Sequence, residues 1–460
     1  MSTFYIEQFG CRATQADGAA IERQLLDRGC TPSSSPSRAE FVVINTCTVT
    51  SAADAEARDA IRKIHEQNPA AKILVTGCYA QRAPEELTAL PGVSFVVGNS
   101  HKPQIPQLIA AQQNNFVQIS PVALQPAVSH SPGLLIGDVF KATHVLVAPV
   151  LGGEGNHTRP TLKIQDGCNN RCSFCVIPFV RGKSRSLPAE AVLSEIRRLS
   201  DSGFQEIVLS GINLGSWGRD LSPRADFLDL LRRILDETPL PRLRISSIEP
   251  LDVTRDLIAL IAGTDRIAEH FHMPLQSGSD NILAAMHRWY RTEHYARRAK
   301  LIREFLPHAA IGADVIAGFP GESESDHQAT LRFIRSLPFT YLHVFSYSAR
   351  PGTRAAALES QLSGPIIHRR ASELRALGES KSAAFRRSQI GRTHRVLTLN
   401  RPPKFSAAPW TPALSSNYLK FRIPEHFPAN QFLDVRGTCS FDGYLNSELA
   451  SPVHFAQASV

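Results

Sequence analysis

Short apolar runs alternate with amphipathic segments over most of the chain. In the first quarter the apolar runs fall at residues 4–6, 41–44, 72–75 and 95–97, and helical patterns fall at residues 19–28 and 52–67. Strands that alternate with helices in this way are typical of a parallel sheet covered by helices. The pattern therefore predicts an open parallel α/β domain over residues 1–114.

The pattern then changes. Between residues 115 and 158, Pro, Ser and Gly are frequent and apolar residues are scattered, which is typical of a linker. Residues 144–147 form a short apolar run that could be a strand. We therefore expect residues 115–158 to connect two domains.

The alternation resumes at residue 159. Strands are predicted at residues 161–164, 206–209, 242–246, 270–273, 311–316 and 341–345, and helices at 188–202, 227–237, 252–262, 280–286, 292–304 and 325–336. Six βα units in about 220 residues predict a complete or partial barrel, whose active centre lies at the carboxyl ends of the strands. We assign residues 159–390 to a central partial (β/α)6 barrel.

The last segment, residues 391–460, has a different pattern. Short strands are predicted near residues 395–399, 418–423, 434–439 and 444, separated by Pro, Gly and Asn, which is typical of a small β-barrel. The segment carries seven Lys and Arg against four Asp and Glu. A small basic barrel fits an RNA-binding module, and a capping domain with a solvated basic face is the alternative.

Composition narrows the class of protein. The chain has a net charge of +8 and a pI near 9.2, so a polyanionic partner such as nucleic acid is plausible. The most apolar long stretch, residues 134–150, is interrupted by Asp138, Lys141 and His144, which argues against a membrane span. Eight cysteines are too few for a disulfide scaffold of this length, and the first residues show no secretory signal. We expect a cytoplasmic protein without membrane contact.

Three of the eight cysteines lie within eight residues, immediately after the first predicted barrel strand. Cys168, Cys172 and Cys175 have the spacing C-x3-C-x2-C. Three thiolates can bind one metal centre and leave one coordination position open, as a catalytic centre requires. A structural zinc site completed by a distant ligand, or chance clustering, is the alternative.

Three further cysteines, Cys11, Cys47 and Cys78, each follow a predicted strand of the first domain. Loops at the carboxyl ends of parallel strands converge on one edge of the sheet, so a second three-thiolate site is predicted there. Three independent buried cysteines are the alternative. Cys30 and Cys439 lie outside both groups and are interpreted as inert.

The sequence around residues 168–175 resembles the radical S-adenosylmethionine signature, in which three thiolates hold a 4Fe–4S cluster whose fourth iron binds S-adenosylmethionine. Residues 163–168, 176–178, 244–250, 273–280 and 312–322 narrow the resemblance to methylthiotransferases. In that family the N-terminal cysteines hold an auxiliary 4Fe–4S cluster, and the tail resembles a TRAM domain. Polar residues after the barrel strands are candidates for binding S-adenosylmethionine, namely Ser247, Glu249 and Gln276.

Residues 45–50 and 211–216 are most similar to the branch that acts on N6-threonylcarbamoyladenosine in tRNA. The resemblance implies methylthiolation of C2 of this nucleoside at position 37, beside the anticodon. Thr14 stands where the family usually has Asn. The alternatives are a methylthiotransferase for isopentenyladenosine in tRNA or for a ribosomal-protein aspartate, and a non-enzymatic zinc- and RNA-binding protein.

The chemistry of the base explains why cofactors would be needed. An adenine C2–H bond is strong and non-acidic, so the reaction calls for radical chemistry, which a cofactor supplies. The resemblance implies that S-adenosylmethionine is both radical source and methyl donor, and we predict no catalytic residue beyond the cluster ligands. Expected partners are the tRNA anticodon loop, an electron donor such as flavodoxin or ferredoxin, and a sulfur source. Basic residues are expected to contact RNA phosphates, among them Arg288, Arg291, Arg297, Arg298, Lys300, Arg369, Arg370, Arg386 and Arg387.

Overall fold

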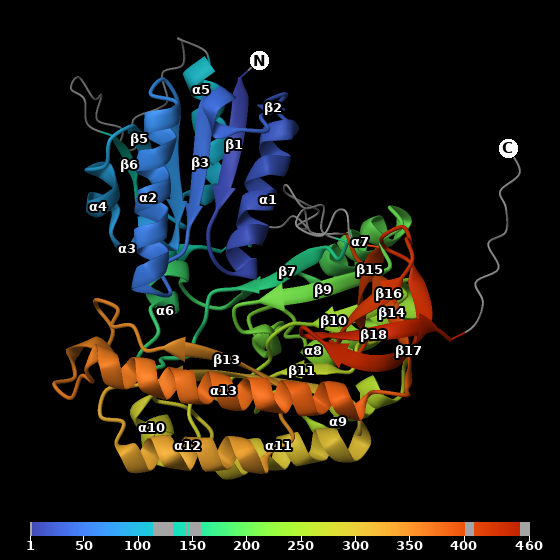
Figure 1. The fold of residues 1–460 in the computed structure, drawn as a ribbon. Coiled ribbons are helices and arrows are strands. Elements are labelled where there is room, and N and C mark those ends of the chain that lie inside the picture. Colours follow the sequence, from blue (N-terminus) through green and yellow to red (C-terminus); the bar gives the residue numbers. More distant parts are fainter. Residues whose placement is uncertain (1, 114–131, 144, 147–157, 401–408, 451–460) are drawn as a thin grey trace, which may run out of the picture.

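The computed structural model shows an N-terminal sheet domain, a central partial barrel and a small closed barrel at the C-terminal end (Figure 1). It describes residues 2–113, 132–143, 145–146, 158–400 and 409–450. The predicted fold class, a multidomain α/β protein with these three kinds of architecture, is confirmed.

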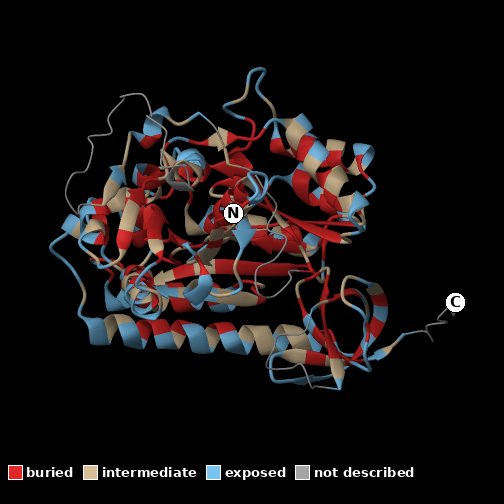
Figure 2. Ribbon diagram, turned by 90° about the horizontal axis from the view of Figure 1, so that it is seen from above, coloured by how far each residue is buried: buried red, intermediate tan, exposed pale blue. Residues whose placement is uncertain are grey.

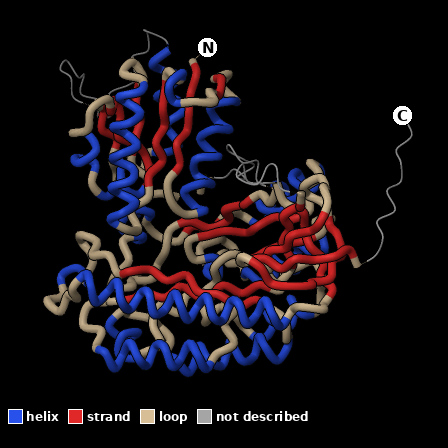
Figure 3. The backbone as a smooth tube through the Cα atoms, in the orientation of Figure 1, coloured by secondary structure: helices blue, strands red, loops and turns tan. Residues whose placement is uncertain are grey.

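Within the described residues the N-terminal sheet has six parallel strands in the order β2-β1-β3-β4-β5-β6. The strands are β1 (Thr3–Gln8), β2 (Thr31–Pro32), β3 (Phe41–Thr46), β4 (Lys72–Gly77), β5 (Val93–Val97) and β6 (Gly133–Leu135). Helices lie on both faces (Figure 3): α1 (Arg12–Leu26), α2 (Ser51–Gln67), α3 (Cys78–Arg82), α4 (Pro84–Thr88) and α5 (Ile105–Gln113). Short 3-10 turns, η1 (Pro36–Arg38) and η2 (Lys102–Gln104), join them.

The alternation of side chains along β3 explains the two cores of this domain. Val42 and Ile44 pack in one hydrophobic cluster with α2, whereas Phe41 and Val43 pack in the other with α1 and α5. Successive strand residues point to opposite faces, so a strand covered on both sides reads as a continuous apolar run. The Thr50 side chain caps α2 by accepting a hydrogen bond from the Ala53 amide, 3.2 Å away.

Part of the predicted linker belongs to this sheet. β6 pairs with β5 and adds the sixth strand, and the turn η3 (Val139–Lys141) follows it. The strand predicted at residues 144–147 falls partly outside the described residues, and Val145 and Leu146 are not in a strand. The boundaries 1–114, 115–158, 159–390 and 391–460 stay predictions.

The central domain contains six parallel strands in the order β7-β9-β10-β11-β12-β13, because isolated bridges continue the β7-β9-β10 sheet into β11-β12-β13. These strands are β7 (Thr161–Asp166), β9 (Glu206–Gly211), β10 (Arg242–Ile245), β11 (His270–His272), β12 (Ala310–Ala317) and β13 (Tyr341–Ser346). β8 (Arg185–Ser186) pairs antiparallel to β7. All six predicted barrel strands are present.

Helices surround the barrel on its outer side (Figure 1). They are α7 (Ala189–Asp201), α8 (Phe227–Glu237), α9 (Arg255–Ala262), α10 (Asp280–Ala285), α11 (Thr292–Phe305), α12 (Glu324–Ser336) and α13 (Gly364–Ser388), with the turns η4 (Leu214–Ser216) and η5 (Ala355–Ala357). The short helix α6 (Ile177–Arg181) instead lies between the N-terminal domain and the barrel and packs against α3 (Figure 1). Buried residues concentrate in the strands, while the helices show buried and exposed faces (Figure 2). The largest hydrophobic core therefore lies between these two layers.

The C-terminal barrel closes in the order β14-β15-β16-β18-β17. Its strands are β14 (Thr393–Thr398), β15 (Trp410–Ser415), β16 (Lys420–Pro424), β17 (Phe432–Phe441) and β18 (Tyr444–Leu449). The sequence pattern did not predict β15, because it contains Pro412, a residue that is disfavoured within strands.

Candidate active site

The first triad, Cys11, Cys47 and Cys78, lies at the carboxyl ends of three neighbouring strands. Cys11 follows β1, Cys47 directly follows β3, and Cys78 directly follows β4. This edge of the sheet faces the central barrel (Figure 1). The predicted convergence of the three loops is therefore present, with Cys47 and Cys78 buried and Cys11 exposed.

Glycines that precede two of these cysteines allow the close approach. Gly10 has a φ of +98°, and a Cβ on it would lie 2.3 Å from the Cβ of Cys47. Gly77 has a φ of +102°, and its Cβ would lie 2.2 Å from the Thr46 carbonyl oxygen. Both positions require glycine for conformation and for space. The pair Gly-Cys occurs again at Gly167-Cys168, but also at Gly29-Cys30 outside both triads, so it does not by itself identify a cluster ligand.

The thiols of the first triad influence one another. Burial, together with negative charge on Cys78 and Cys11, raises the pKa of Cys47 to about 11. Three thiolates this close together are unfavourable without a cation, whereas a metal centre stabilises deprotonated sulfur. The donor set therefore fits an iron–sulfur cluster.

Thr14 and Asn99 contact the sulfurs of the first triad. The Thr14 hydroxyl lies 3.6 Å from Cys11 Sγ and 3.5 Å from Arg181 Nη2. Asn99 Nδ2 lies 3.6 Å from Cys78 Sγ. Thr14 is the position at which the sequence departs from the family pattern. Its hydroxyl keeps a polar contact to the triad there, because a hydroxyl both donates and accepts hydrogen bonds.

The second triad, Cys168, Cys172 and Cys175, lies in the loop between β7 and α6. Ser173 fixes this loop from two sides: its amide donates to the Met286 carbonyl over 3.1 Å, and its carbonyl accepts from the Ala355 amide over 2.9 Å. Burial raises the pKa of Cys175 to about 12, and the neighbouring thiolates add to the rise. This donor set also suits a cationic cluster.

Arg288 contacts the second triad directly. Its Nη1 donates a hydrogen bond to Cys172 Sγ over 3.2 Å, and its Nη2 forms an ion pair with Glu249. The expectation that Arg288 contacts RNA phosphates is therefore wrong, because the side chain is buried in these two interactions. It is also wrong for Arg370, which is buried against Glu322 with an Nη1–Oε2 distance of 2.7 Å.

The three candidates for S-adenosylmethionine binding lie on neighbouring barrel strands or just beyond their ends. Ser247 follows β10 and bridges to His272 of β11, and Glu249 pairs with Arg288 beside Cys172. Gln276 bridges to β12 and lines a cavity of about 240 Å³. The structure places all three around the barrel opening; their ligand remains a prediction.

That cavity lies between the two domains. Cys175 and Phe174 of the second-triad loop form one wall, and Val49 and Thr50, which follow Cys47, form another. Barrel residues complete the lining, namely Gln276, Asp314, Ile316, Phe345 and Arg350. A ligand in this cavity would therefore lie between the loops that carry the two triads.

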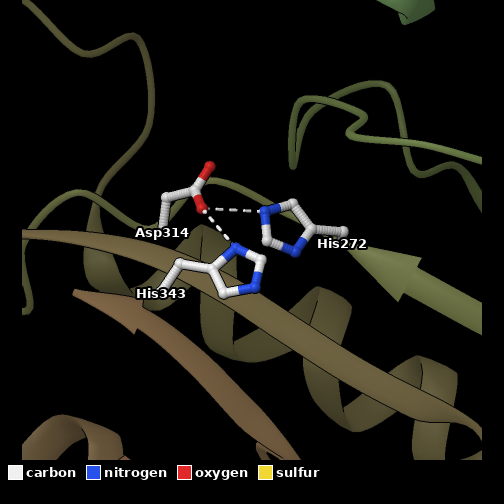
Figure 4. Close-up of side chains that lie close together, drawn as sticks. All are labelled: His272, Asp314 and His343. Atoms are coloured by element: carbon white, nitrogen blue, oxygen red, sulfur yellow. Dashed lines mark ion pairs between the residues drawn. The ribbon is translucent and has the colours of Figure 1, made fainter. Parts of the chain in front are cut away.

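A polar cluster lies on the inner side of the barrel beside the cavity (Figure 4). Asp314 Oδ1 lies 2.9 Å from His272 Nε2 and 3.3 Å from His343 Nδ1. Tyr341 contacts this cluster through His272: its hydroxyl lies 2.9 Å from His272 Nδ1 and 2.7 Å from His270 Nε2. One ligand atom from each of His272, Asp314 and His343 lies within 4.8 Å of the others, a donor set that a divalent cation could also use.

Buried ion pairs hold the N-terminal domain against the barrel. Arg350, beyond β13, pairs with Asp54 of α2 and donates to the Thr48 hydroxyl over 2.9 Å. Closer to β7, Asp17 of α1 pairs with Lys163 and with Arg181. Because both clusters adjoin the triad loops, they fix the relative position of the two cysteine triads.

Two family models match the chain: the uncharacterized protein family UPF0004 over residues 3–98, and the radical SAM superfamily over residues 162–334. The threonylcarbamoyladenosine tRNA methylthiotransferase MtaB of Aquifex aeolicus is 36% identical over 394 residues, which cover 85% of this chain and 92% of that protein. The protein of the same name from Bacillus subtilis is 37% identical over 386 residues, which cover 84% of this chain and 82% of that protein.

Related enzymes with another name also match. The tRNA-2-methylthio-N(6)-dimethylallyladenosine synthase of Carboxydothermus hydrogenoformans is 32% identical, with coverage of 86% of this chain and 87% of that protein. Among solved structures, the radical S-adenosylmethionine methyltransferase TsrM from Kitasatospora setae superposes with a TM-score of 0.56 at 16% identity, over 77% of each chain, which shows a shared fold.

None of the helices in the described residues is long and apolar enough to cross a membrane. Two cysteine triads on facing domains, the barrel fold and the extent of these similarities agree with one another. The chain therefore belongs to the radical S-adenosylmethionine methylthiotransferase family.

Proposed function

We propose that this chain methylthiolates C2 of N6-threonylcarbamoyladenosine at position 37 of tRNA, giving the 2-methylthio derivative. The observation that carries the proposal is the cavity between the two triad loops, in a chain 36–37% identical to enzymes of this name. A base in this cavity would be within reach of both cysteine sites. We infer that the enzyme acts in the cytoplasm, where tRNA is used in translation.

In this proposal the first triad holds an auxiliary 4Fe–4S cluster and the second triad holds the cluster that binds S-adenosylmethionine. Ser247, Glu249 and Gln276 contact that cofactor. When bound, the clusters and S-adenosylmethionine supply the radical chemistry, the sulfur and the methyl group that acid–base side chains cannot supply.

The chain's own residues position these groups. The Ser173 backbone fixes the second-triad loop on Met286 and Ala355, and the Ser173 hydroxyl donates to the Ala285 carbonyl. Arg288 holds Cys172 through a charge-assisted hydrogen bond. Arg350 holds the segment after Cys47 against the barrel, which keeps the distance between the triads constant. Val49, Phe174 and Ile316 give the cavity apolar walls, which favour the face of a base over water.

The domains have separate roles in this proposal. Residues 1–114 carry the auxiliary cluster, residues 115–158 link them to the radical SAM core at 159–390, and residues 391–460 bind the tRNA. The anticodon loop is single-stranded, so its bases can be unstacked without opening a duplex. The enzyme also needs an electron donor such as flavodoxin or ferredoxin, and a sulfur source.

A second candidate substrate is dimethylallyladenosine in tRNA, because relatives with that activity in their names are 32–35% identical to this chain. Mass spectrometry of tRNA nucleosides from a deletion strain separates the two. Loss of 2-methylthio-N6-threonylcarbamoyladenosine, with restoration by the gene, supports the proposal. Unchanged levels of that nucleoside contradict it.

Metal analysis of anaerobically purified protein tests the non-enzymatic alternative. Two 4Fe–4S clusters predict about eight irons per chain, with matching sulfide. One or two zinc ions and no iron would instead indicate a structural zinc protein.

A further inference from the structure

Three neighbouring barrel strands bring two imidazoles and one carboxylate together. His272 is the last residue of β11, Asp314 lies within β12, and His343 lies within β13. Asp314 and His343 are opposite each other in the register of β12 and β13, and His272 pairs with Gly312 of β12. Residues two apart on a strand point to the same face. The register therefore places all three side chains on one face of the sheet.

Gly312 makes room for a tyrosine that orients one of the imidazoles. A Cβ on Gly312 would lie 2.0 Å from Cζ of Tyr341, so glycine is needed where the tyrosine ring crosses the strand. The Tyr341 hydroxyl lies 2.9 Å from His272 Nδ1, and His272 Nε2 is directed at Asp314. A histidine that binds a metal through one ring nitrogen usually forms a hydrogen bond with the other. His272 therefore already has the supporting contact of a metal ligand.

The three candidate ligand atoms have the spacing of a coordination site. Asp314 Oδ1 lies 2.9 Å from His272 Nε2 and 3.3 Å from His343 Nδ1, and all three atoms lie within 4.8 Å of one another. Ligands at about 2.0–2.2 Å from an ion lie about 2.8–3.6 Å from their neighbours in octahedral or tetrahedral geometry. Figure 4 shows one carboxylate oxygen facing both rings. A small rotation of the exposed His343 side chain completes the arrangement.

The charge of the cluster favours a cation. Asp314 carries a negative charge and a neutral imidazole carries none, so the three groups together are anionic. Among the described residues, Asp314 forms ion pairs only with these two histidines, and neither Lys nor Arg neutralises it. Two imidazoles with one carboxylate are a donor set that divalent first-row transition metals prefer over Mg²⁺ or Ca²⁺.

The cluster is accessible on two sides. The His343 side chain is 53% exposed, so an ion can enter from solvent. Asp314 also lines the cavity of about 240 Å³ between the two triad loops. Three protein ligands leave at least one coordination position open, as in metal sites that bind a further ligand. An oxygen atom of a molecule in the cavity could occupy that position.

We propose that His272 Nε2, the Asp314 carboxylate and His343 Nδ1 bind one divalent transition-metal ion, and that they bind Zn²⁺ more tightly than Mn²⁺. The nitrogen and oxygen ligands distinguish this site from the two cysteine triads, which offer only sulfur. The site belongs to the barrel and is independent of which nucleoside the enzyme modifies.

Zinc binding to the reconstituted holoenzyme tests the proposal, because filled clusters keep the six triad cysteines from binding zinc. The protein is incubated anaerobically with zinc chloride, and loosely bound metal is removed by gel filtration. We expect about one zinc per chain in addition to about eight irons. X-ray absorption at the zinc edge should show nitrogen and oxygen ligands at about 2.0–2.2 Å and no sulfur at about 2.3 Å. Mn²⁺ should compete weakly and Mg²⁺ not at all.

Variants separate the ligands from the residue that orients them. Tyr341→Phe removes the orienting hydroxyl and should lower zinc affinity about 10- to 100-fold. His343→Gln removes a ligand at an exposed position, so it should fold normally and lower zinc affinity by more than that factor. Asp314→Asn removes the negative charge and should have an effect at least as large. His368→Gln, at an exposed histidine of α13, is the matched control and should bind zinc as the wild type does.

Three results would overturn the assignment. One is a wild type that retains no more zinc than His343→Gln does. Another is a zinc spectrum with sulfur ligands, which would place the ion at cysteines. The third is an equal loss of zinc in His368→Gln, which would indicate adventitious binding to surface histidines. Failure of the proposed tRNA activity would leave the zinc result unaffected, because the readout is metal binding.

Discussion

Arg288 donates a hydrogen bond to the sulfur of Cys172 over 3.2 Å, although the two residues are 116 positions apart in the chain. The same guanidinium pairs with Glu249, so Arg288 links a cysteine of the second triad to a candidate cofactor-binding residue. A cation that donates to a cluster thiolate stabilises the reduced cluster, which carries more negative charge. We therefore expect Arg288 to tune the electron affinity of a cluster held by the second triad.

Replacement of Arg288 by Gln should make the midpoint potential of the second-triad cluster more negative. Loss of a charged hydrogen bond of about 1.5–3 kcal/mol corresponds to about 65–130 mV for one electron. A redox titration followed by electron paramagnetic resonance measures the shift. Arg291→Gln is the control, because the Arg291 guanidinium donates to the carbonyls of Arg288 and Tyr290 and makes no contact with the second triad among the described residues. An unchanged potential in the Arg288 variant would show that the contact is only structural.

The two triads should differ in the step that they support. Cys172→Ala should abolish cleavage of S-adenosylmethionine to 5′-deoxyadenosine, whereas Cys47→Ala should keep much of that cleavage and stop sulfur insertion. Each variant should lose one cluster, so that iron falls from about eight to about four per chain. Chromatography of the nucleosides and iron analysis provide the measurements. Cys439→Ala, an exposed cysteine of the C-terminal barrel, is the control. If Cys172→Ala and Cys47→Ala reduced S-adenosylmethionine cleavage and sulfur insertion to the same partial extent, the assignment of separate roles to the two triads would be wrong.

The strands and the convergence of the triads could be predicted because they follow from local pattern. Strands β3 and β4 are continuous apolar runs, and parallel neighbours necessarily end at the same edge. The start of α1 was missed, since its first turns contain polar residues that are buried. Asp17 is one of them, and it is hidden by pairs with Lys163 and Arg181 of the other domain. In a sequence, a buried charged residue cannot be distinguished from an exposed one, because its ion-pair partner is not known.

Contacts between distant segments explain the other differences. By sequence alone Arg288 and Arg370 fall among the basic residues expected to contact phosphate, because composition does not show that each has a buried carboxylate partner. The His272–Asp314–His343 cluster combines residues from three strands, and only the register of β11, β12 and β13 brings them together. Such sites depend on tertiary pairing, which a single sequence does not display.

Removal of the Asp54 carboxylate should weaken the contact between the domains. Asp54 is buried between Arg350 and Arg82, and Arg82 Nη2 lies 3.1 Å from it. Asp54→Asn leaves the buried guanidinium of Arg350 without its ion-pair partner and leaves Arg82 only a 4.0 Å pair with the exposed Glu86, which should lower the free energy of unfolding by about 3–5 kcal/mol. Chemical denaturation measures this change. Asp59→Asn removes an exposed pair with Arg62 and should cost under about 1 kcal/mol. If Asp54→Asn and Asp59→Asn lowered the free energy of unfolding equally, the buried ion pairs of Asp54 would not be an important source of stability.

Stability should decrease as the pH falls below about 6.5, in part through His394. Burial lowers the pKa of His394 to about 4, and the positive charge of Arg392 contributes. An unfolded chain has the ordinary pKa near 6.5, so between pH 6.5 and 4 the unfolded state binds more protons. The contribution of His394 to stability is therefore fully present above pH 6.5 and is lost toward pH 4, by at most about 3.4 kcal/mol. Thermal unfolding from pH 7.5 to 4.5 should show a smaller loss for His394→Asn than for the wild type. If the unfolding temperatures of the wild type and of His394→Asn fell in parallel with pH, His394 would not contribute to the loss of stability.

The C-terminal barrel presents an aromatic and basic surface that fits unstacked nucleotides. The Arg422 guanidinium lies 4.9 Å from the Trp410 ring centroid, 4.7 Å from that of Tyr444 and 5.4 Å from that of Phe441. Phe441 is 62% exposed, so it can stack on a base without rearrangement.

Phe441→Ala should therefore weaken tRNA binding by about 1–3 kcal/mol and leave the thermal unfolding temperature unchanged. The slope of affinity against salt concentration should also stay the same, because no charge is removed, whereas Lys420→Gln should reduce that slope by about one. Fluorescence anisotropy with labelled tRNA at several salt concentrations provides both values. Leu26→Ala, which removes a comparably exposed apolar side chain from α1, is the control. Wild-type affinity in the Phe441 variant would show that the RNA does not stack on this surface.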